Sequence, residues 1–315
     1  MNIKKVGLTA LAASLVSVSA HAGEMSVAGS ASIGLKNTSK TSTGKSWTMG
    51  NQLTFSGSGE LDNGMNVSLS FVIDQNDDST KSTAAQLDNA PFDSHSVTVS
   101  SDAMGSLKFS GEGGSSAQSA IDTTAAGDLW DNGSGFDTPK ASEAGNNSFV
   151  YTLPSLMDDL TLVGSYSPGS AGGPSATAFR LGFTGVEGLS VDFAEGQIET
   201  VGSEADVTTI KGSYAISSFT LSASSTEYDA ASGDETVDSY NVAYTVSDDI
   251  SIAYGTETIE TQGSTVDEEA DKFNVSYTTG GVTLSATQYN FEGSGNIAGA
   301  AGEKERWSLS ATFAF

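Results

Sequence analysis

Apolar and polar residues alternate along most of the chain from about residue 25 onward. The last segment is the clearest case, since every second residue is apolar: Trp307, Leu309, Ala311, Phe313 and Phe315. The same period recurs in residues 65–73, 179–183, 240–246 and 273–277. A period of two is typical of β-strands with one apolar and one polar face, because successive side chains point to opposite sides. The chain after its first segment is therefore predicted to be all-β.

The connections between these strands fall into two groups. The short ones are rich in Gly, Asn and Asp, which suit tight hairpins, and lie at residues 61–64, 102–105, 154–159, 185–188, 216–218, 247–249 and 279–281. The long ones are polar and acidic and lie at residues 36–46, 75–93, 112–147, 168–174, 197–205, 228–236, 258–271 and 292–303. Short and long connections alternate, which predicts about sixteen strands.

This alternation of connections favours a transmembrane antiparallel up-and-down β-barrel. Such barrels have an even number of strands, short turns at one end and longer loops at the other. About sixteen strands enclose an aqueous lumen, so the polar face of each strand points inward and the apolar face meets lipid. A closed ring of strands also satisfies every backbone group inside hydrocarbon. A β-sandwich gives no reason for the regular alternation of loop lengths.

The first segment has a different pattern. Lys4 and Lys5 precede an apolar run over residues 6–18, and Ala20 and Ala22 follow it in an Ala-x-Ala arrangement. These are the three parts of a secretory signal peptide, and the apolar run is too short to span a membrane as a helix. Residues 1–22 are therefore predicted to be cleaved and residues 23–315 to form the barrel. The alternative is a buried N-terminal helix.

Composition and charge narrow the function. There are 13 Lys and Arg residues against 39 Asp and Glu, giving a formal charge of −26, and cleavage after Ala22 would make it −28. Nucleic acid is not a predicted partner, because phosphate binding needs clustered Lys and Arg. The sequence has no Cys, which excludes disulfides and thiolate metal sites. A hydrophobic content of 37% is enough for a barrel with a wet interior.

Four segments carry a family resemblance: residues 23–29, residues 105–111, the pair 146–154 and 160–168, and the alternating strand that ends at Phe315. Through them the chain resembles the general diffusion porins of Gram-negative outer membranes, particularly the smaller alphaproteobacterial members. The resemblance implies a bacterial outer-membrane location, contact with outer-membrane lipid, and passive diffusion of ions and small hydrophilic solutes. It also implies a homotrimer, and it makes Phe313 and Phe315 the C-terminal insertion signal.

The resemblance further implies that the third long loop, Glu112–Asn147, folds into the lumen and narrows it. The acidic residues predicted at this constriction are Asp122, Asp128, Asp131, Asp137 and Glu143. The basic residues that alternation places on the pore wall are Lys36, Lys108, Arg180 and Lys211. Carboxylates at a constriction attract cations and repel anions, so a weak to moderate cation preference is predicted. The alternative is that these residues form an ordinary solvated acidic loop.

Two acidic groups in the predicted outer loops offer oxygen ligands of the kind that Ca²⁺ and Mg²⁺ prefer. They comprise Asp74, Asp77, Asp78 and Asp88, and Glu257, Glu260, Asp267, Glu268, Glu269 and Asp271. Loosely bound divalent ions are one interpretation, and a solvated face is the other; no further cofactor is predicted. Outward aromatic residues near strand ends are predicted to lie at the membrane interfaces: Trp47, Tyr214, Tyr277, Trp307 and Phe315.

Three other functions remain open from sequence. One is a substrate-specific channel on the same barrel, and another is a secreted, acidic, β-rich adhesin or surface protein. The third is an outer-membrane lipase, which would have to use His95, the only His after residue 22. No Gly-x-Ser-x-Gly motif supports a lipase, so the protein is not predicted to be an enzyme.

Overall fold

The computed structural model describes residues 24–38, 44–74, 92–133, 135–142, 146–169 and 173–315. Within them the chain forms sixteen strands. The strands are β1 (Met25–Thr38), β2 (Lys45–Glu60), β3 (Asn66–Asp74), β4 (Ser94–Ser101), β5 (Gly105–Glu112), β6 (Ser148–Thr152), β7 (Leu160–Ser167), β8 (Ser175–Phe183), β9 (Leu189–Thr200), β10 (Ser203–Ile216), β11 (Phe219–Ala230), β12 (Glu235–Ser247), β13 (Ile250–Thr261), β14 (Glu268–Thr279), β15 (Val282–Glu292) and β16 (Lys304–Ala314). The two short 3₁₀ helices are η1 (Leu129–Asn132) and η2 (Gly299–Ala301).

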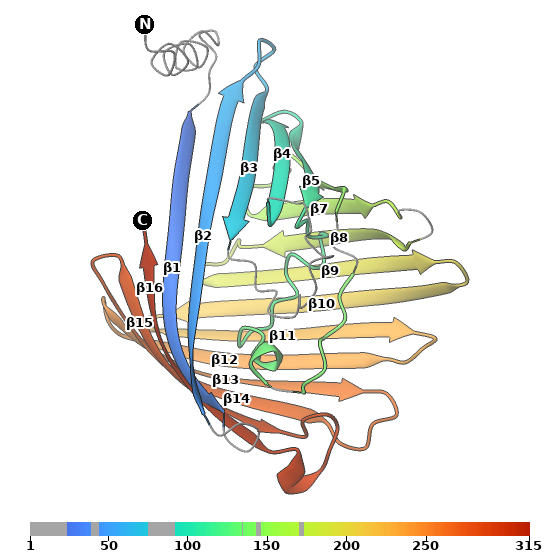
Figure 1. Ribbon diagram of the computed structural model, residues 1–315. Coiled ribbons are helices and arrows are strands. Elements are labelled where there is room, and N and C mark those ends of the chain that lie inside the picture. The colour runs from blue at the N-terminus through green and yellow to red at the C-terminus, as the bar shows by residue number, and fades with distance from the viewer. Residues whose placement is uncertain (1–23, 39–43, 75–91, 134, 143–145, 170–172) are drawn as a thin grey trace, which may run out of the picture.

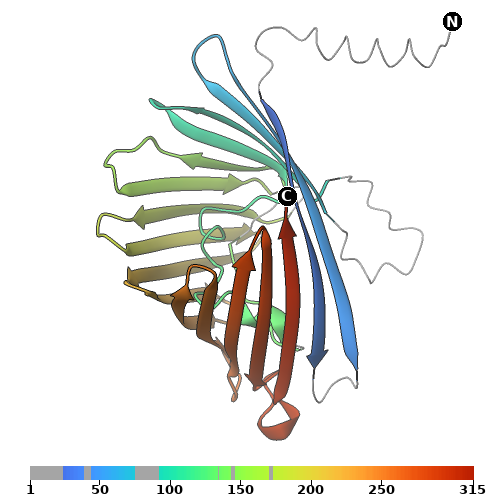
Figure 2. The same cartoon turned by 90° about the vertical axis from the view of Figure 1, so that its left-hand side faces the viewer.

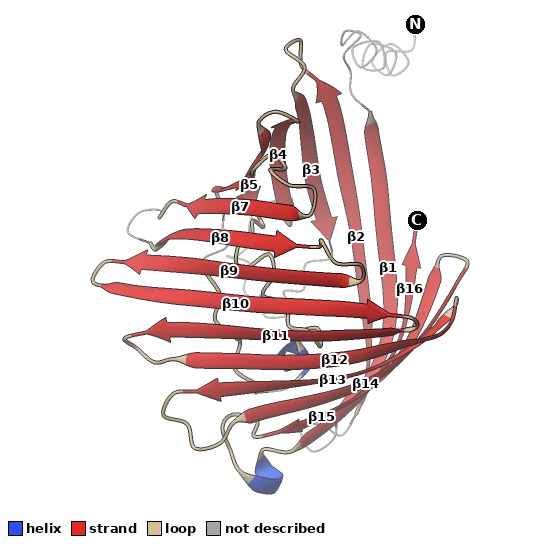
Figure 3. Cartoon of the chain, turned by 180° about the vertical axis from the view of Figure 1, so that it is seen from behind, coloured by secondary structure: helices blue, strands red, loops and turns tan. Residues whose placement is uncertain are grey.

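Each strand pairs antiparallel with its neighbours in sequence, and β1 pairs with β16 to close the barrel. Figures 1 and 3 show this continuous sheet from opposite sides, with most of the described chain in strands. At the seam, Gly29 and Phe315 exchange two backbone hydrogen bonds of 2.8 and 3.0 Å. Closure leaves no free sheet edge, as a barrel in hydrocarbon requires. The predicted all-β up-and-down barrel is confirmed.

The register assigns a side to each residue. Lys36 pairs with Ser308 on the face that points inward, whereas Leu35 pairs with Leu309 on the outward face. Large apolar residues of the outward face are exposed, for example Ile210 at 54% and Tyr240 at 58%. This face is the one that meets lipid. None of the helices in the described residues is long and apolar enough to cross a membrane.

The five aromatic residues predicted at the membrane interfaces all lie on the outward face. Trp47 and Trp307 lie near the end of the barrel that carries the long loops. Tyr214, Tyr277 and Phe315 lie near the other end, beside the short turns. This arrangement matches the two aromatic girdles of transmembrane barrels.

Two of the predicted long loops are wrong. Residues 197–205 contain only a tight connection at 201–202, and residues 228–236 contain only a connection at 231–234. The strands on either side continue past the apolar belt, and there their outward residues become polar and acidic, as at Asp206 and Asp229. Because the backbone ladder does not depend on side-chain polarity, the strands extend where the apolar signal stops.

Candidate pore constriction

Loop 3 connects β5 and β6, and its described residues, 113–133, 135–142 and 146–147, lie inside the barrel. In Figures 1 and 2 its green trace runs across the inner side of the later strands. Its outgoing half is held by hydroxyls of successive strands. The amides of Ala125 and Ala126 donate to Ser224 Oγ on β11 and Ser239 Oγ on β12, at 2.8 and 2.9 Å. The predicted inward fold of this loop is confirmed.

Two inward-facing glycines allow the loop to lie directly on the wall. A Cβ at Gly196 on β9 would be 2.5 Å from the Cβ of Ser142, and one at Gly255 on β13 would be 2.7 Å from the Cβ of Ala126. Those distances are far below van der Waals contact, so any larger residue would push the loop into the lumen.

Three buried glutamates of adjacent strands receive loop 3 amides. Glu235, Glu257 and Glu268 are only 5%, 2% and 1% exposed. Glu257 accepts hydrogen bonds from Thr124 Oγ1 at 2.6 Å and from the amides of Leu129 and Trp130 at 3.2 and 2.9 Å. Glu235 and Glu268 bind the part of the loop after η1.

The far part of loop 3 is held by the same chemistry. Glu268 accepts the Asp137 amide at 2.7 Å, and Glu235 accepts the Lys140 amide at 2.8 Å. Lys140 also places its Nζ 3.9 Å from Glu235. Backbone amides bound by carboxylates are strong, charge-assisted hydrogen bonds.

Basic residues of the wall hold the loop carbonyls. Lys211 on β10 donates to the Thr123 carbonyl, and Lys272 on β14 donates to that of Ala126. Arg306 Nη1 on β16 donates to the Asn132 carbonyl at 3.0 Å. We call these six wall residues the loop-3 clamp: Glu235, Glu257, Glu268, Lys211, Lys272 and Arg306. Glutamates hold amides and bases hold carbonyls, so the clamp matches the polarity of the backbone.

An apolar cluster packs beneath η1. Leu129 is fully buried against Ala270 of β14 and Phe291 of β15. Phe136 also contacts this cluster, with its ring centroid 5.2 Å from that of Phe291. Burial of apolar side chains at this point adds a hydrophobic contribution to the hydrogen bonds of the loop-3 clamp.

Two of the predicted acidic residues face one small cavity. Asp122 and Asp128 line a cavity of about 60 Å³ together with Lys140. Burial, together with the nearby charge of Asp128, raises the pKa of Asp122 from 3.8 to about 6, while the charge of Lys211 opposes the shift. The charge of Asp122 therefore changes near pH 6.

The other predicted acids are more scattered. Asp128 shapes its own turn, because its Oδ1 accepts the Thr124 amide at 2.9 Å and its φ of 49° is left-handed. Asp131 is exposed on η1, and Asp137 is exposed with its Oδ2 3.3 Å from Asn296 Nδ2. Glu143 lies outside the described residues. The predicted acids therefore line the loop instead of forming one compact ring.

The four predicted wall bases all face inward, but their surroundings differ. Lys36 and Lys108 lie on β1 and β5, opposite Ser308 and Thr98 in the register. Lys211 belongs to the loop-3 clamp. Arg180 forms an ion pair with Asp192 on β9, with Nη2 and Oδ1 2.7 Å apart.

A profile of the family described as Gram-negative porin matches residues 7–249, which is more than half of the chain. The chain belongs to the Gram-negative porin family. A comparison with curated proteins gives no match. Membership and the closed sixteen-stranded barrel make the protein an outer-membrane channel for passive diffusion.

Solved structures resemble this porin in fold at low identity. Salmonella typhi OmpF in complex with daunomycin has a TM-score of 0.72 at 11% identity, covering 93% of this chain and 98% of that one. The trimer form of Vibrio cholerae OmpT has a TM-score of 0.67 at 15% identity, covering 93% and 100%. An anion-selective porin from Comamonas acidovorans has a TM-score of 0.65 at 15% identity, also covering 93% and 100%.

Sequence reasoning missed most of the residues that position loop 3 in this porin. The sequence pattern predicts Glu257 and Glu268 in an acidic outer loop, and this prediction is wrong, because both are buried strand residues that face inward. The sequence prediction does not include Glu235, Lys272, Arg306 or Asp192. The alternation of the sequence could have predicted that Glu257 faces inward. It shares every second position of β13 with Ser251, Ala253 and Gly255.

The remaining predicted positions fall elsewhere. His95 lies on the outward face of β4, opposite Phe71 in the register and with its ring centroid 6.3 Å from that of Phe92. Ala20, Ala22 and the acidic residues Asp77, Asp78 and Asp88 lie outside the described residues. In the part of the chain that the structure describes, no three His, Asp or Glu side chains come together as a metal site would require.

Proposed function

We propose that solutes pass between loop 3 and the wall formed by β1–β6. The observation that carries this proposal is the position of loop 3, whose hydrogen bonds reach β7, β10–β14 and β16. In the described residues of loop 3, the hydrogen bond with β1–β6 is at the end of the loop, where the Asn147 amide donates to the Gly111 carbonyl of β5 at 3.3 Å. The rest of that wall remains available to line the passage. The constriction then consists of loop 3 acids on one side and the inward residues of β1–β6, including Lys36 and Lys108, on the other.

Within this proposal, the channel has a weak cation preference. Inside the barrel, carboxylates and bases are close to balance, since the loop-3 clamp and the Arg180–Asp192 pair each combine both signs. Excess acid is found on the outward face at the loop end of β9–β16: Glu195, Glu199, Glu204, Asp206, Glu227, Asp229, Asp238, Glu260, Glu269, Asp271, Glu292 and Glu305. This charge raises the cation concentration at the mouth.

The assembly and processing of the chain are also part of the proposal. A homotrimer is supported by the family and by the trimer form of Vibrio cholerae OmpT, which shares the fold. Cleavage after Ala22 would release the signal peptide. Phe313 and Phe315, on the outward side of the seam between β1 and β16, would serve as the insertion signal.

Planar-bilayer recording of the detergent-extracted protein tests the channel and its preference. We expect stepwise conductance in groups of three and a reversal potential in a KCl gradient that favours potassium slightly. Chloride preference would overturn the charge assignment. Absence of any conductance, together with release of the protein from cells without detergent, would favour a surface adhesin instead.

A further inference from the structure

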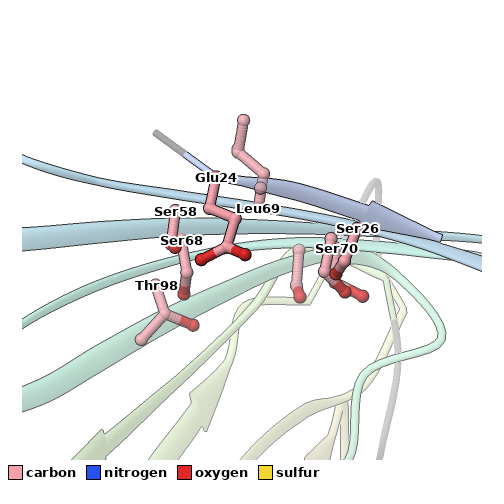
Figure 4. Close-up of a pocket in the computed structure, with 10 residues that line it drawn as sticks. Glu24, Ser26, Ser58, Ser68, Leu69, Ser70 and Thr98 are labelled. Carbon is pink, nitrogen blue, oxygen red and sulfur yellow. The ribbon is translucent and has the colours of Figure 1, made fainter. Parts of the chain in front are cut away.

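The inner wall of β1–β4 contains a hollow of about 460 Å³ near the short-turn end of the barrel. Its lining comes from Glu24 and from inward positions of four adjacent strands (Figure 4). In that view Glu24, Ser58, Ser68 and Thr98 extend from one side of the sheet, whereas Leu69 belongs to the outward face. A volume of this size is in the range of small-molecule sites.

The register explains why hydroxyls gather in this hollow. Ser58 pairs with Ser68, and Ser68 pairs in turn with Thr98, so three hydroxyl residues lie side by side across β2, β3 and β4. At the next inward position of β3, two residues further along, Ser70 pairs with both Ser56 and Ser96. Directly opposed residues have Cβ atoms about 5 Å apart, so the wall presents a two-dimensional lattice of hydroxyls.

These hydroxyls are available to a ligand. In the described residues, no side-chain hydrogen bond occupies the hydroxyls of Ser58, Ser68 or Thr98. Elsewhere in the lumen hydroxyls do pair with each other, as Thr209 and Thr226 do at 3.0 Å. Each free hydroxyl is one donor and two acceptors, so the lattice offers both functions at closely spaced points.

Charge decides which class of solute fits. Glu24 is the only charged residue of the lining, and its carboxylate disfavours anions. A cation in the hollow would interact with the carboxylate of Glu24 and with no other charged residue of the lining. A neutral polyol matches the whole lining, because its hydroxyls donate to Glu24 and both donate to and accept from the serines.

We infer that this hollow is a subsite for neutral polyhydroxylated solutes, that is, sugars and other polyols, close to the short-turn exit of the channel. The inference rests on the proposed function, because the solute reaches the hollow through the lumen. The hollow is open to water, so we expect weak, rapidly reversible occupancy that delays a polyol without trapping it.

The test is planar-bilayer recording in KCl with trehalose added on the short-turn side. The control solute is an ethylene glycol oligomer of equal hydrodynamic size, which presents mainly ether oxygens. In the wild-type channel we expect trehalose to lower the conductance saturably at millimolar concentration and to add current noise. The oligomer should lower the conductance only in proportion to the conductivity of the solution.

The variants compare hydroxyls inside and outside the hollow. S58A/S68A/S70A should raise the half-saturating trehalose concentration at least fivefold, and Glu24→Gln should raise it about twofold. The matched control S213A/S222A/S285A removes three inward hydroxyls of β10, β11 and β15, near the same end of the barrel but outside the hollow, and should leave trehalose block unchanged.

Three results would overturn the inference while KCl conductance persists. These are equal effects of trehalose and the oligomer, equal trehalose block in the wild type and the hollow variant, or block by ethylenediamine but not by trehalose. Loss of KCl conductance in the wild-type protein would instead overturn the proposed function, and the subsite with it.

Discussion

The two sides of the lumen are built from different chemistry. The wall of β7–β16 carries buried charges, and loop 3 covers it through hydrogen bonds to residues such as Glu257 and Arg306. The wall of β1–β4 carries small hydroxyl residues and leaves a hollow of about 460 Å³. Charged residues in this porin therefore serve first to fix a loop, and the side left for solutes is largely neutral. Selectivity cannot be inferred from a count of inward charges, because many of them are already engaged.

The largest effect on the difference between the two walls is expected when Glu257, the central residue of the loop-3 clamp, is removed. Glu257→Ala leaves the Leu129 and Trp130 amides without their acceptor, which should cost loop attachment about 2–4 kcal/mol. We expect a lower thermal unfolding temperature, noisier single-channel current and a higher mean conductance. Glu260→Ala, an exposed outward residue of the same strand, is the control and should behave like the wild type. Quiet current in Glu257→Ala would show that loop 3 does not depend on this carboxylate.

Two lysine substitutions, one on each wall, should have different effects on stability and on ion selectivity. Lys272→Gln removes a donor to the Ala126 carbonyl and should mainly destabilise loop 3, by about 1–2 kcal/mol. Lys108→Gln, on the uncovered wall, should leave unfolding unchanged and shift the reversal potential toward potassium. Thermal unfolding and reversal potential are measured on both variants. The reverse assignment of effects would contradict the division between clamp and passage.

The dependence of the cation preference on ionic strength shows which acidic residues cause it. If the preference arises from acids at the mouth, salt should screen it, since the Debye length is about 10 Å at 0.1 M and about 3 Å at 1 M. We expect the potassium-to-chloride permeability ratio to fall toward one between 0.1 and 1 M KCl. A ratio that does not change with salt would place the selective charges in the narrow part of the lumen.

The smallest expected effect concerns Asp122. Its pKa is raised by burial to about 6, so it is neutral below that pH and ionised above it. Protonation therefore stabilises loop 3 fully below about pH 4, and this stabilisation is lost as the pH rises through about 6. The potassium preference should rise over the same window, within about twofold. Asp122→Asn should remove the step, whereas Asp131→Asn should retain it; a step in both variants would assign it to another group.

The sequence predicts those features of the fold that depend on a pattern within one segment of the chain. Strand faces such as Trp307–Phe315 depend on alternation within one segment, and the register confirms them. The family resemblance implies the inward fold of loop 3, and the structure confirms it. Of the clamp residues only Lys211 is predicted on the pore wall, and the sequence does not predict that any of them holds loop 3, because their partners are distant in sequence: Glu257 binds amides 127 and 128 positions away. A carboxylate near a loop looks solvated unless its strand face is known.

The seam between β1 and β16 also bears on how the barrel comes into being. Neighbouring hairpins can assemble one after another from local contacts, but the seam joins segments such as Ile33 and Ala311 that are almost the whole chain apart. Contacts of that range carry the largest loop-closure entropy and are slow to form. Until they form, two unpaired strand edges are exposed and can pair with other chains. We therefore expect closure to be the last step of assembly, since it brings together the two strands that are synthesised furthest apart in time.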